Sequence, residues 1–126
     1  MPLPHRQIAA AIGLSAAAWA FDAAAAKDLT IQVGVAPGGL ADTAARLIAS
    51  HIGPFLKDNP RVIVENVPGA GGVILDRLLQ TTEPNDGSVI AVLALGQVVS
   101  TVLDPTSTGI KLDGFKWIGA VTEEPG

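Results

Sequence analysis

The sequence predicts an α/β protein: a three-layer arrangement in which a parallel sheet carries helices on both faces. Apolar strand-like segments alternate along the chain with segments whose apolar residues recur every three or four positions, as in amphipathic helices. Two of the strand-like segments each run into a glycine-rich loop that opens a helical segment. The resulting order, strand–helix–strand–helix–strand–helix–strand, favours parallel pairing through right-handed crossovers.

The first unit is a strand, a turn and a helix. Residues 29–35 alternate apolar with polar or small side chains, which is typical of a strand. A Pro-Gly-Gly turn at residues 37–39 ends that strand. A helix is then expected over residues 40–52, and Asp42 near its start suits the helix dipole and can cap free N–H groups. The expected apolar stripe of this helix consists of Leu40, Ala44, Leu47, Ile48 and Ile52.

A polar turn leads from this helix into the second unit. Phe55 and Leu56 are expected to pack against the end of the first helix, and residues 61–65 read as the second strand. The second glycine loop follows, and a helical pattern restarts at Val73. In that helix Ile74, Leu75, Leu78 and Leu79 form the apolar stripe, whereas Asp76 and Arg77 are expected to face outward.

The rest of the chain predicts one more unit and a final strand. Residues 88–95 form a nearly continuous apolar run, which is typical of a parallel strand that is buried on both faces. Gly96 and Gln97 then form a candidate third turn facing a ligand, and residues 98–103 a short helix. Residues 104–113 read as a loop, and residues 115–121 as a fourth strand.

The N-terminus has the order of regions found in a signal peptide. A short segment with Arg6 precedes an apolar, alanine-rich stretch over residues 8–21, and small residues follow at 23–26. Residues 1–26 are therefore expected to be a signal peptide that directs export of the chain, and residues 27–126 the mature part. The alternative is an alanine-rich cytosolic helix.

Composition argues against several functions. The chain of 126 residues has a formal net charge of −4 and few aromatic residues, which disfavours nucleic-acid binding. It has no cysteine, so disulfides and thiol chemistry are excluded. We expect no cofactor and no metal site, because His51 is the only histidine outside the leader.

Catalytic residues are not evident either. His51 falls late in the first helix, away from the loops, and reads as a helix-surface histidine. Asp42 and Glu65 could be imagined as an acid/base pair, but a capping role explains Asp42 better. The second glycine loop fails the dinucleotide pattern because residue 74 is isoleucine, and the first loop lacks the Gly-Lys-Ser/Thr of a P-loop.

The two glycine loops together predict an anion site made of main-chain groups. A strand-to-helix junction points free N–H groups and the positive end of the helix dipole at one place. Gly38 and Gly39 have no Cβ, so a ligand oxygen could approach their backbone closely. Two such loops after parallel strands would lie at the sheet edge where open α/β folds bind ligands.

At these loops the chain resembles the extracytoplasmic solute receptors of tripartite tricarboxylate transporters, the Bug or TctC-like family. That family has a V-P-[FY]-x-[AP]-G-G-x-[ST]-D-x-x-A-R segment, matched here by residues 33–46 (VGVAPGGLADTAAR). Its V-x-V-E-N-x-P-G-A-G-G segment is matched by residues 62–72 (VIVENVPGAGG), and its P-D-G-Y-T-L turn loosely by residues 84–90.

The resemblance implies a non-enzymatic periplasmic binding protein with the two-domain, type II fold, which passes a small carboxylate to membrane permease subunits. Residues 27–126 would then be a partial N-terminal ligand-binding domain, with the second domain missing. The ligand carboxylate would be held by loop residues through backbone groups and water. The positions carried over, with Gln97 added from the third turn, are Pro37, Gly38, Gly39, Ala41, Asp42, Gly69, Ala70, Gly71, Gly72 and Gln97.

The chain departs from the family pattern in three places. Gly34 replaces a common proline and loosens the start of the first loop, Ala41 lacks a common hydroxyl, and the last turn carries Asn85 and Ser88. Family members are also longer, so residues 27–126 would form only one side of the ligand cleft and would bind the ligand weakly or not at all. Two alternatives stay open: a small enzyme that binds a phosphorylated substrate or nucleotide at the loops, and a non-functional truncated remnant.

Overall fold

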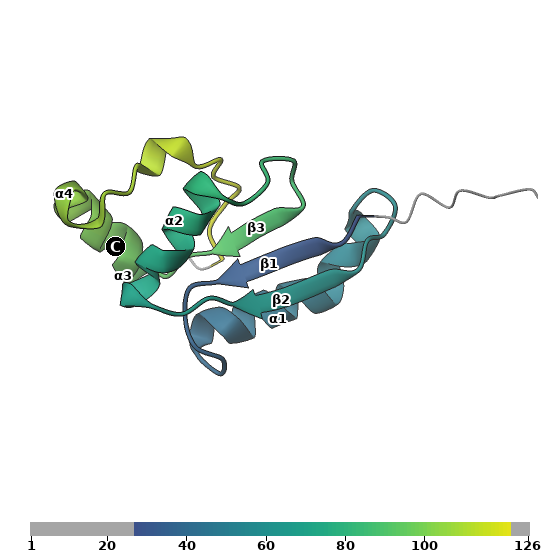
Figure 1. Cartoon of the computed structure of the whole chain (residues 1–126). Helices are drawn as coiled ribbons and strands as arrows, with labels where there is room; N and C mark the ends of the chain where they lie inside the picture. Colours follow the sequence, from purple (N-terminus) through teal and green to yellow (C-terminus); the bar gives the residue numbers. More distant parts are fainter. Residues whose placement is uncertain (1–26, 122–126) are drawn as a thin grey trace, which may run out of the picture.

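The structure is a computed structural model that describes residues 27–121, so the predicted leader lies outside the described residues. Its centre is a three-stranded parallel sheet in the order β2-β1-β3 (Figure 1). Strand β1 spans Leu29–Val33, β2 spans Val62–Asn66 and β3 spans Val89–Val92. The α/β class and the parallel pairing predicted from the sequence are confirmed for these strands.

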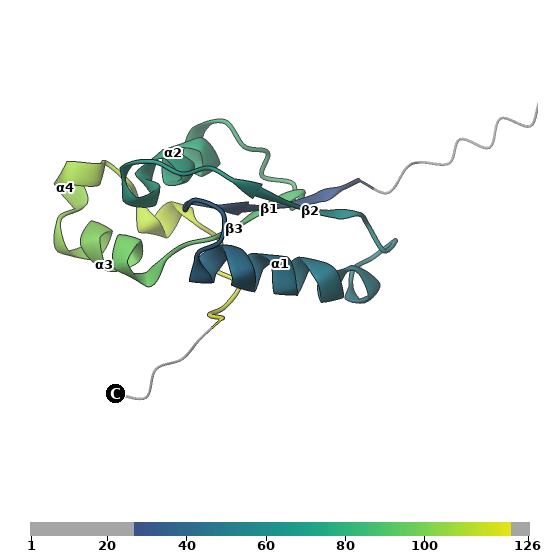
Figure 2. The ribbon, with the colours of Figure 1, turned by 90° about the horizontal axis from the view of Figure 1, so that it is seen from below.

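Helices lie on both faces of the sheet, as the predicted three layers require. Helix α1 (Leu40–Ile52) lies on one face and α2 (Val73–Thr81) on the other, as the edge-on view in Figure 2 shows. This placement follows from the topology, because right-handed crossovers from β1 to β2 and from β2 to β3 run in opposite directions across the sheet. Helix α3 (Leu95–Leu103) and the short α4 (Pro105–Thr108) follow β3.

The core lies between α1 and the sheet. Ile31, Val33 and Ala45 are fully buried there, because alternate residues of β1 point to the same face. The partly buried side chains packed around them are Val35, Ala41, Ile48, Ala49, Val62, Val64, Ile90 and Val92. The apolar face predicted for the first strand is therefore confirmed.

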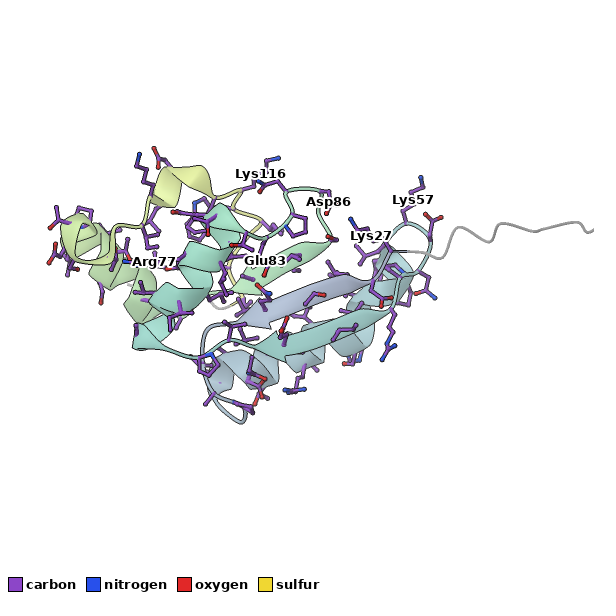
Figure 3. All side chains as sticks on the ribbon, viewed as in Figure 1. Lys27, Lys57, Arg77, Glu83, Asp86 and Lys116 are labelled. Carbon is purple, nitrogen blue, oxygen red and sulfur yellow. The ribbon has the colours of Figure 1, made fainter. Side chains whose placement is uncertain are left out.

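The opposite face of the sheet is more polar. Gln32 points toward the α2 side and its Nε2 donates to Glu65 Oε2 (3.3 Å) and Glu83 Oε1 (2.9 Å). Glu83 lies over this face of the sheet, and Lys27 pairs with Asp86 at the end of the sheet away from the glycine loops (Figure 3). The Lys27–Asp86 pair therefore lies at the opposite end of the sheet from the glycine loops.

Helix α1 buries a different stripe from the one predicted. Leu40 is 84% exposed and Leu47 is also exposed, whereas Ala41, Ala45 and Ala49 face the sheet. The prediction weighted leucine over alanine, but small side chains allow the helix to approach the sheet closely. Ile48 belongs to both stripes and is packed against the core as expected.

Phe55 is a second correction in this region. It was expected to pack against the end of α1, yet it is 86% exposed. It falls in the 3₁₀ turn Gly53–Phe55 that follows the helix, so it no longer continues the direction of α1.

The predicted fourth strand at residues 115–121 is wrong: the described part of that segment forms no strand. Local contacts hold it instead. The Phe115 and Trp117 rings meet edge to face with centroids 5.9 Å apart, and Trp117 Nε1 donates to the Leu112 carbonyl (3.2 Å). The predicted loop over residues 104–113 contains α4 and the start of the 3₁₀ turn Leu112–Gly114.

The third strand is shorter than predicted, and the following helix is longer. Strand β3 ends at Val92, and α3 begins at Leu95 because the Ala94 carbonyl accepts from the N–H groups of Gln97 (3.0 Å) and Val98 (3.3 Å). The expected helix at 98–103 is confirmed as the greater part of α3. Gln97 therefore lies within a helix and not in a turn.

Candidate functional site

The two glycine loops begin at the same edge of the sheet. Strands β1 and β2 are parallel neighbours, with Val33 opposite Asn66, so both loops leave from the carboxyl ends of adjacent strands. The Val67 N–H donates to the Val33 carbonyl (2.8 Å) just as the loops begin. A Cβ on Gly34 would come within 3.2 Å of the Gly72 Cα, so the loops touch where both residues are glycine. The predicted meeting of the two loops is confirmed.

Asp42 braces the first loop from inside. Its Oδ2 accepts from the Gly38 N–H (2.8 Å) and from Arg46 Nε (3.0 Å), and its Oδ1 accepts from Asn66 Nδ2 (2.8 Å). The residue is only 3% exposed. Arg46 first, and then the Gly38 and Asn66 donors, hold the pKa of this carboxyl well below its usual range. The predicted capping role of Asp42 is wrong, because its carboxylate accepts from the Gly38 N–H ahead of the helix and no side chain caps α1. The carboxylate faces protein groups.

Asn66 and Arg46 were missed as site residues, although both stand in the segments that carry the resemblance. Asn66 Nδ2 also donates to the Val35 carbonyl (3.1 Å), and Arg46 Nη2 donates to Asn66 Oδ1 (3.0 Å). These bonds tie the end of β2 to the first loop. The sequence signal that could have identified Arg46 was its position four residues after Asp42, which places an acidic and a basic side chain on one face of the helix.

The second loop has an unusual backbone. Gly69, Ala70, Gly71 and Gly72 all have positive φ, of 145°, 48°, 65° and 102°. The Gly72 N–H donates to the Gly69 carbonyl (2.9 Å), which closes the short 3₁₀ turn Ala70–Gly72 ahead of α2. The run of left-handed residues explains why three of the four are glycine. In residues 27–121 the N–H groups of Ala70 and Gly71 have no acceptor.

The start of α1 offers further free donors. Thr43 is the first residue of α1 whose N–H donates a helical hydrogen bond, to the Gly39 carbonyl at 2.9 Å. No side chain caps the helix. Within the described chain the N–H groups of Gly39, Leu40 and Ala41 have no acceptor. The Gly38 N–H, which was predicted to face the ligand, donates to Asp42 instead. The N–H groups of the three residues after it remain available to a ligand. Pro37 lies exposed in the turn just ahead of them.

The Gln97 side chain extends from α3 to the contact between the two glycine loops. A Cβ on Gly72 would overlap its side-chain amide, and a Cβ on Gly34 would lie 3.6 Å from its Oε1. Gln97 is 7% exposed, and neither of its amide atoms has a hydrogen-bond partner within the described residues. The structure thus brings Gly34, Gly72 and Gln97 together, although Gln97 was predicted to lie in a turn.

Asp76 was expected to face outward and is instead 1% exposed. It lies one helical turn after Gly72, beside the Gln97 side chain. Burial raises the pKa of this carboxyl, and the neighbouring Gln97 opposes that shift only in part. The sequence pattern placed Asp76, together with Arg77, on the outward face of an amphipathic helix. It gave no sign that α3 would cover that side of α2.

The residues considered for catalysis do not come together. Glu65 and Asn66 are successive strand residues on opposite faces, so Glu65 meets Gln32 on one side while Asn66 meets Asp42 on the other. The imagined Asp42–Glu65 pair is therefore wrong. His51 is exposed at the far end of α1, with Nδ1 2.9 Å from the Leu47 carbonyl. Across residues 27–121, no three His, Asp or Glu side chains are grouped as metal ligands would be.

Two hollows in the surface lie away from the loops. One of about 400 Å³ lies near Gln80, Asn85 and Lys111, and another of about 320 Å³ lies between α1 and β2 near Arg46 and Ser50. Neither is lined by a residue of the glycine loops. The exposure of Gly39, Leu40, Ala70 and Gly71 shows that the loops present an open surface, which suits one wall of a cleft.

Comparison with known proteins supports the resemblance of the loop segments. No family model matches the chain. It is 32% identical over 108 residues to the "UPF0065 protein in the TAR-I ttuE-ttuC′ intergenic region" of Agrobacterium vitis, an alignment covering 86% of this chain and 30% of the relative. It is 36% identical over 69 residues to the "UPF0065 protein in gbd 5′region" of Cupriavidus necator, covering 55% and 20%.

The chain thus spans less than a third of the length of the curated relatives it matches. Between residues 27 and 121, no helix has the length and apolar character needed to cross a bilayer. The identity, the two loop segments and the parallel α/β sheet agree with one another. The chain is therefore a distant and partial homologue of the UPF0065 proteins, which are the Bug or TctC-like family.

Proposed function

We propose that the chain is a non-enzymatic solute-binding protein, or part of one, that captures a small organic carboxylate at its glycine loops. The observation that carries this proposal is the pairing of two loops at one sheet edge, each with main-chain N–H groups that lack an acceptor in the described chain. Backbone donors at a helix start favour an anion and need no reactive side chain.

The remaining functional assignments rest on family membership. Residues 27–126 would form part of the N-terminal domain of a two-domain, type II periplasmic binding protein, with residues 1–26 as the exported leader. The bound carboxylate would be passed to the membrane permease subunits of a tripartite tricarboxylate transporter. The site would comprise the predicted loop positions, with Asp42 acting from inside the loop.

The enzyme alternative has less support. Acid/base catalysis would need a titratable side chain facing the loop surface. The Asp42 carboxylate already accepts hydrogen bonds from Gly38, Arg46 and Asn66, and His51 lies at the other end of α1. A binding role needs neither group to react.

The test is a titration of the ¹⁵N-labelled chain with succinate, citrate and aspartate, followed by amide shifts. We expect saturable shifts of the N–H groups of Gly39, Ala41, Ala70 and Gly71. Because the loop surface is open, the dissociation constant should be on the order of 1 mM, which corresponds to about 4 kcal/mol. Submicromolar affinity would refute the view that these residues form only one wall of the cleft. Absence of any shift would refute the proposed site at the loops.

A pair of charge variants tests the electrostatics. Leu40→Asp adds a negative charge at the exposed first position of α1, where it suits the helix dipole but repels an anionic ligand. Ser50→Asp adds the same charge at the exposed other end of the same helix. We expect Leu40→Asp to weaken binding about ten-fold and Ser50→Asp to leave it unchanged. Equal effects would show that the start of α1 does not hold the anion.

A further inference from the structure

Helix α3 buries polar side chains and exposes apolar ones. The buried residues are Gln97 and Thr101, which lie four positions apart on one face of the helix. On the opposite face four apolar residues are between 44% and 80% exposed, and we call them the α3 stripe: Leu95, Val99, Val102 and Leu103. This reverses the usual arrangement of an amphipathic helix, so the α3 stripe is a surface that another apolar surface would cover.

The α3 stripe carries no charge. Residues 95–103 contain no acidic or basic side chain, and the first charged residue after them is Asp104. Figures 1 and 2 both show α3 beside α4 at one end of the molecule, where no other element of the described chain covers the stripe. An exposed apolar surface without charged residues is typical of the centre of a contact between protein chains.

The spacing of the α3 stripe is the same in both directions from its middle. Leu95 and Leu103 each lie four residues from Val99, which is about 6 Å along the helix axis. Two copies of α3 that cross antiparallel at Val99 would therefore place Leu95 of one copy against Leu103 of the other. Such a contact uses the same patch on both copies, as a two-fold interface requires.

The two ends of α3 are also complementary in an antiparallel pair. At the start of the helix the N–H groups of Leu95 and Gly96 have no acceptor within the described residues, and no side chain caps them. At its end the exposed residue Asp104 carries a carboxylate. Antiparallel pairing places each carboxylate near the start of the other helix, where the helix dipole favours a negative charge. A parallel pair would bring the two Asp104 carboxylates together, and they would repel each other.

We propose that the α3 stripe is an interface between two copies of this chain, which pair antiparallel about a two-fold axis at Val99. The interface is small: four side chains of one short helix bury about 400 Å² on each copy, which is about half of what a stable dimer buries. The dissociation constant should therefore be on the order of 0.1 mM. The pairing is independent of any ligand at the glycine loops, because the α3 stripe lies on the face of α3 opposite Gln97.

Cysteine cross-linking of the whole chain tests the interface directly, because the chain has no cysteine of its own. Val99→Cys places one thiol of each copy on the proposed axis, so mild oxidation of protein at about 0.1 mM should give a disulfide-linked dimer as the main product. Leu47→Cys is the matched control, because it introduces the same thiol at an exposed apolar residue of α1. It should give less than about a tenth of that dimer. Equal yields from the two variants would overturn the proposed interface.

A mixing experiment tests the antiparallel direction. Leu95→Cys and Leu103→Cys, oxidised together, should give about five-fold more dimer than either variant gives alone, because the two positions face each other only in an antiparallel pair. A higher yield from either variant alone would overturn that direction.

Sedimentation equilibrium measures the association without a cross-link. Val99→Glu places two carboxylates face to face in the interface and should weaken dimerisation about ten-fold or more, whereas Leu47→Glu should leave it unchanged. A parent chain that stays monomeric at about 1 mM, or association that Val99→Glu does not weaken, would overturn the proposed pairing. Open-ended oligomers in place of a dimer would overturn it as well, because a two-fold contact closes on itself.

Discussion

Gly72→Ala is the substitution that most directly tests the close approach of the two loops and α3. Gly72 has a φ of 102° and its Cα supports the Gln97 side-chain amide. An alanine there must adopt a left-handed backbone conformation, and its methyl group must displace a buried side chain. The neighbouring Gly71 has a φ of 65°, and nothing lies within 4 Å of the place where its Cβ would stand. Gly71→Ala therefore carries the backbone strain without the steric conflict.

The expected costs follow from this difference. A left-handed alanine costs about 1 kcal/mol, which is the whole expected loss of unfolding free energy for Gly71→Ala. Forcing extra volume into a packed site adds about 2 kcal/mol, so Gly72→Ala should lose about 3 kcal/mol in total.

Urea denaturation of both variants measures these losses, and a double-mutant cycle isolates the steric part. Gln97→Ala removes the side chain that the new methyl group would strike. In that background Gly72→Ala should cost about 1 kcal/mol, like Gly71→Ala, and the coupling energy should be about 2 kcal/mol. If the two glycine variants lose equal stability, or if the coupling is absent, then Gln97 does not lie against Gly72 and the assembly of the site is wrong.

Three further variants test the remaining features. Asp42→Asn should destabilise the chain at pH 7. The folded state lowers the pKa of Asp42 far below its usual value, so its stabilising effect is fully present above about pH 4 and is lost only gradually as the pH falls toward the folded value; the urea midpoints of variant and parent should draw closer below about pH 4 and still differ at about pH 3. Asp76→Asn should behave oppositely, because burial raises that pKa and ionisation costs stability as the pH rises: a gain of about 1 kcal/mol at pH 7 should vanish at pH 3. Leu75→Ala removes a fully buried side chain and should cost about 3 kcal/mol in thermal or urea unfolding, and a loss below 1 kcal/mol would contradict its burial.

Much of the fold could be predicted because short-range patterns decide it. Strict alternation over residues 29–35 identifies β1 and its buried face, and the Pro-Gly-Gly turn marks the start of α1. Both glycine loops follow strands, so the parallel order was enough to place them at one edge. The position of Asp42 near the helix start was predictable, but its partner was not: the carboxylate accepts from Gly38 in the loop and does not cap the helix.

Other features depend on which elements meet, and periodicity does not contain that information. The sheet covers Ala45 and not Leu47, and α3 covers Asp76, so apolar character alone misjudged both helices. The segment after Phe115 has strand-like composition, but a strand exists only where a partner supplies its hydrogen bonds. The pairing of Glu65 with Gln32 and of Asn66 with Asp42 likewise depends on which face of the sheet each residue reaches.

The sequence by itself determined the α/β class, the two main-chain loops and their common edge, because each follows from residues close together in the chain. Only the tertiary structure decided that Gln97 from α3 and Asp76 from α2 stand behind those loops. The physical reason is that the absence of a Cβ at Gly34 and Gly72 permits an approach between segments that are far apart in sequence.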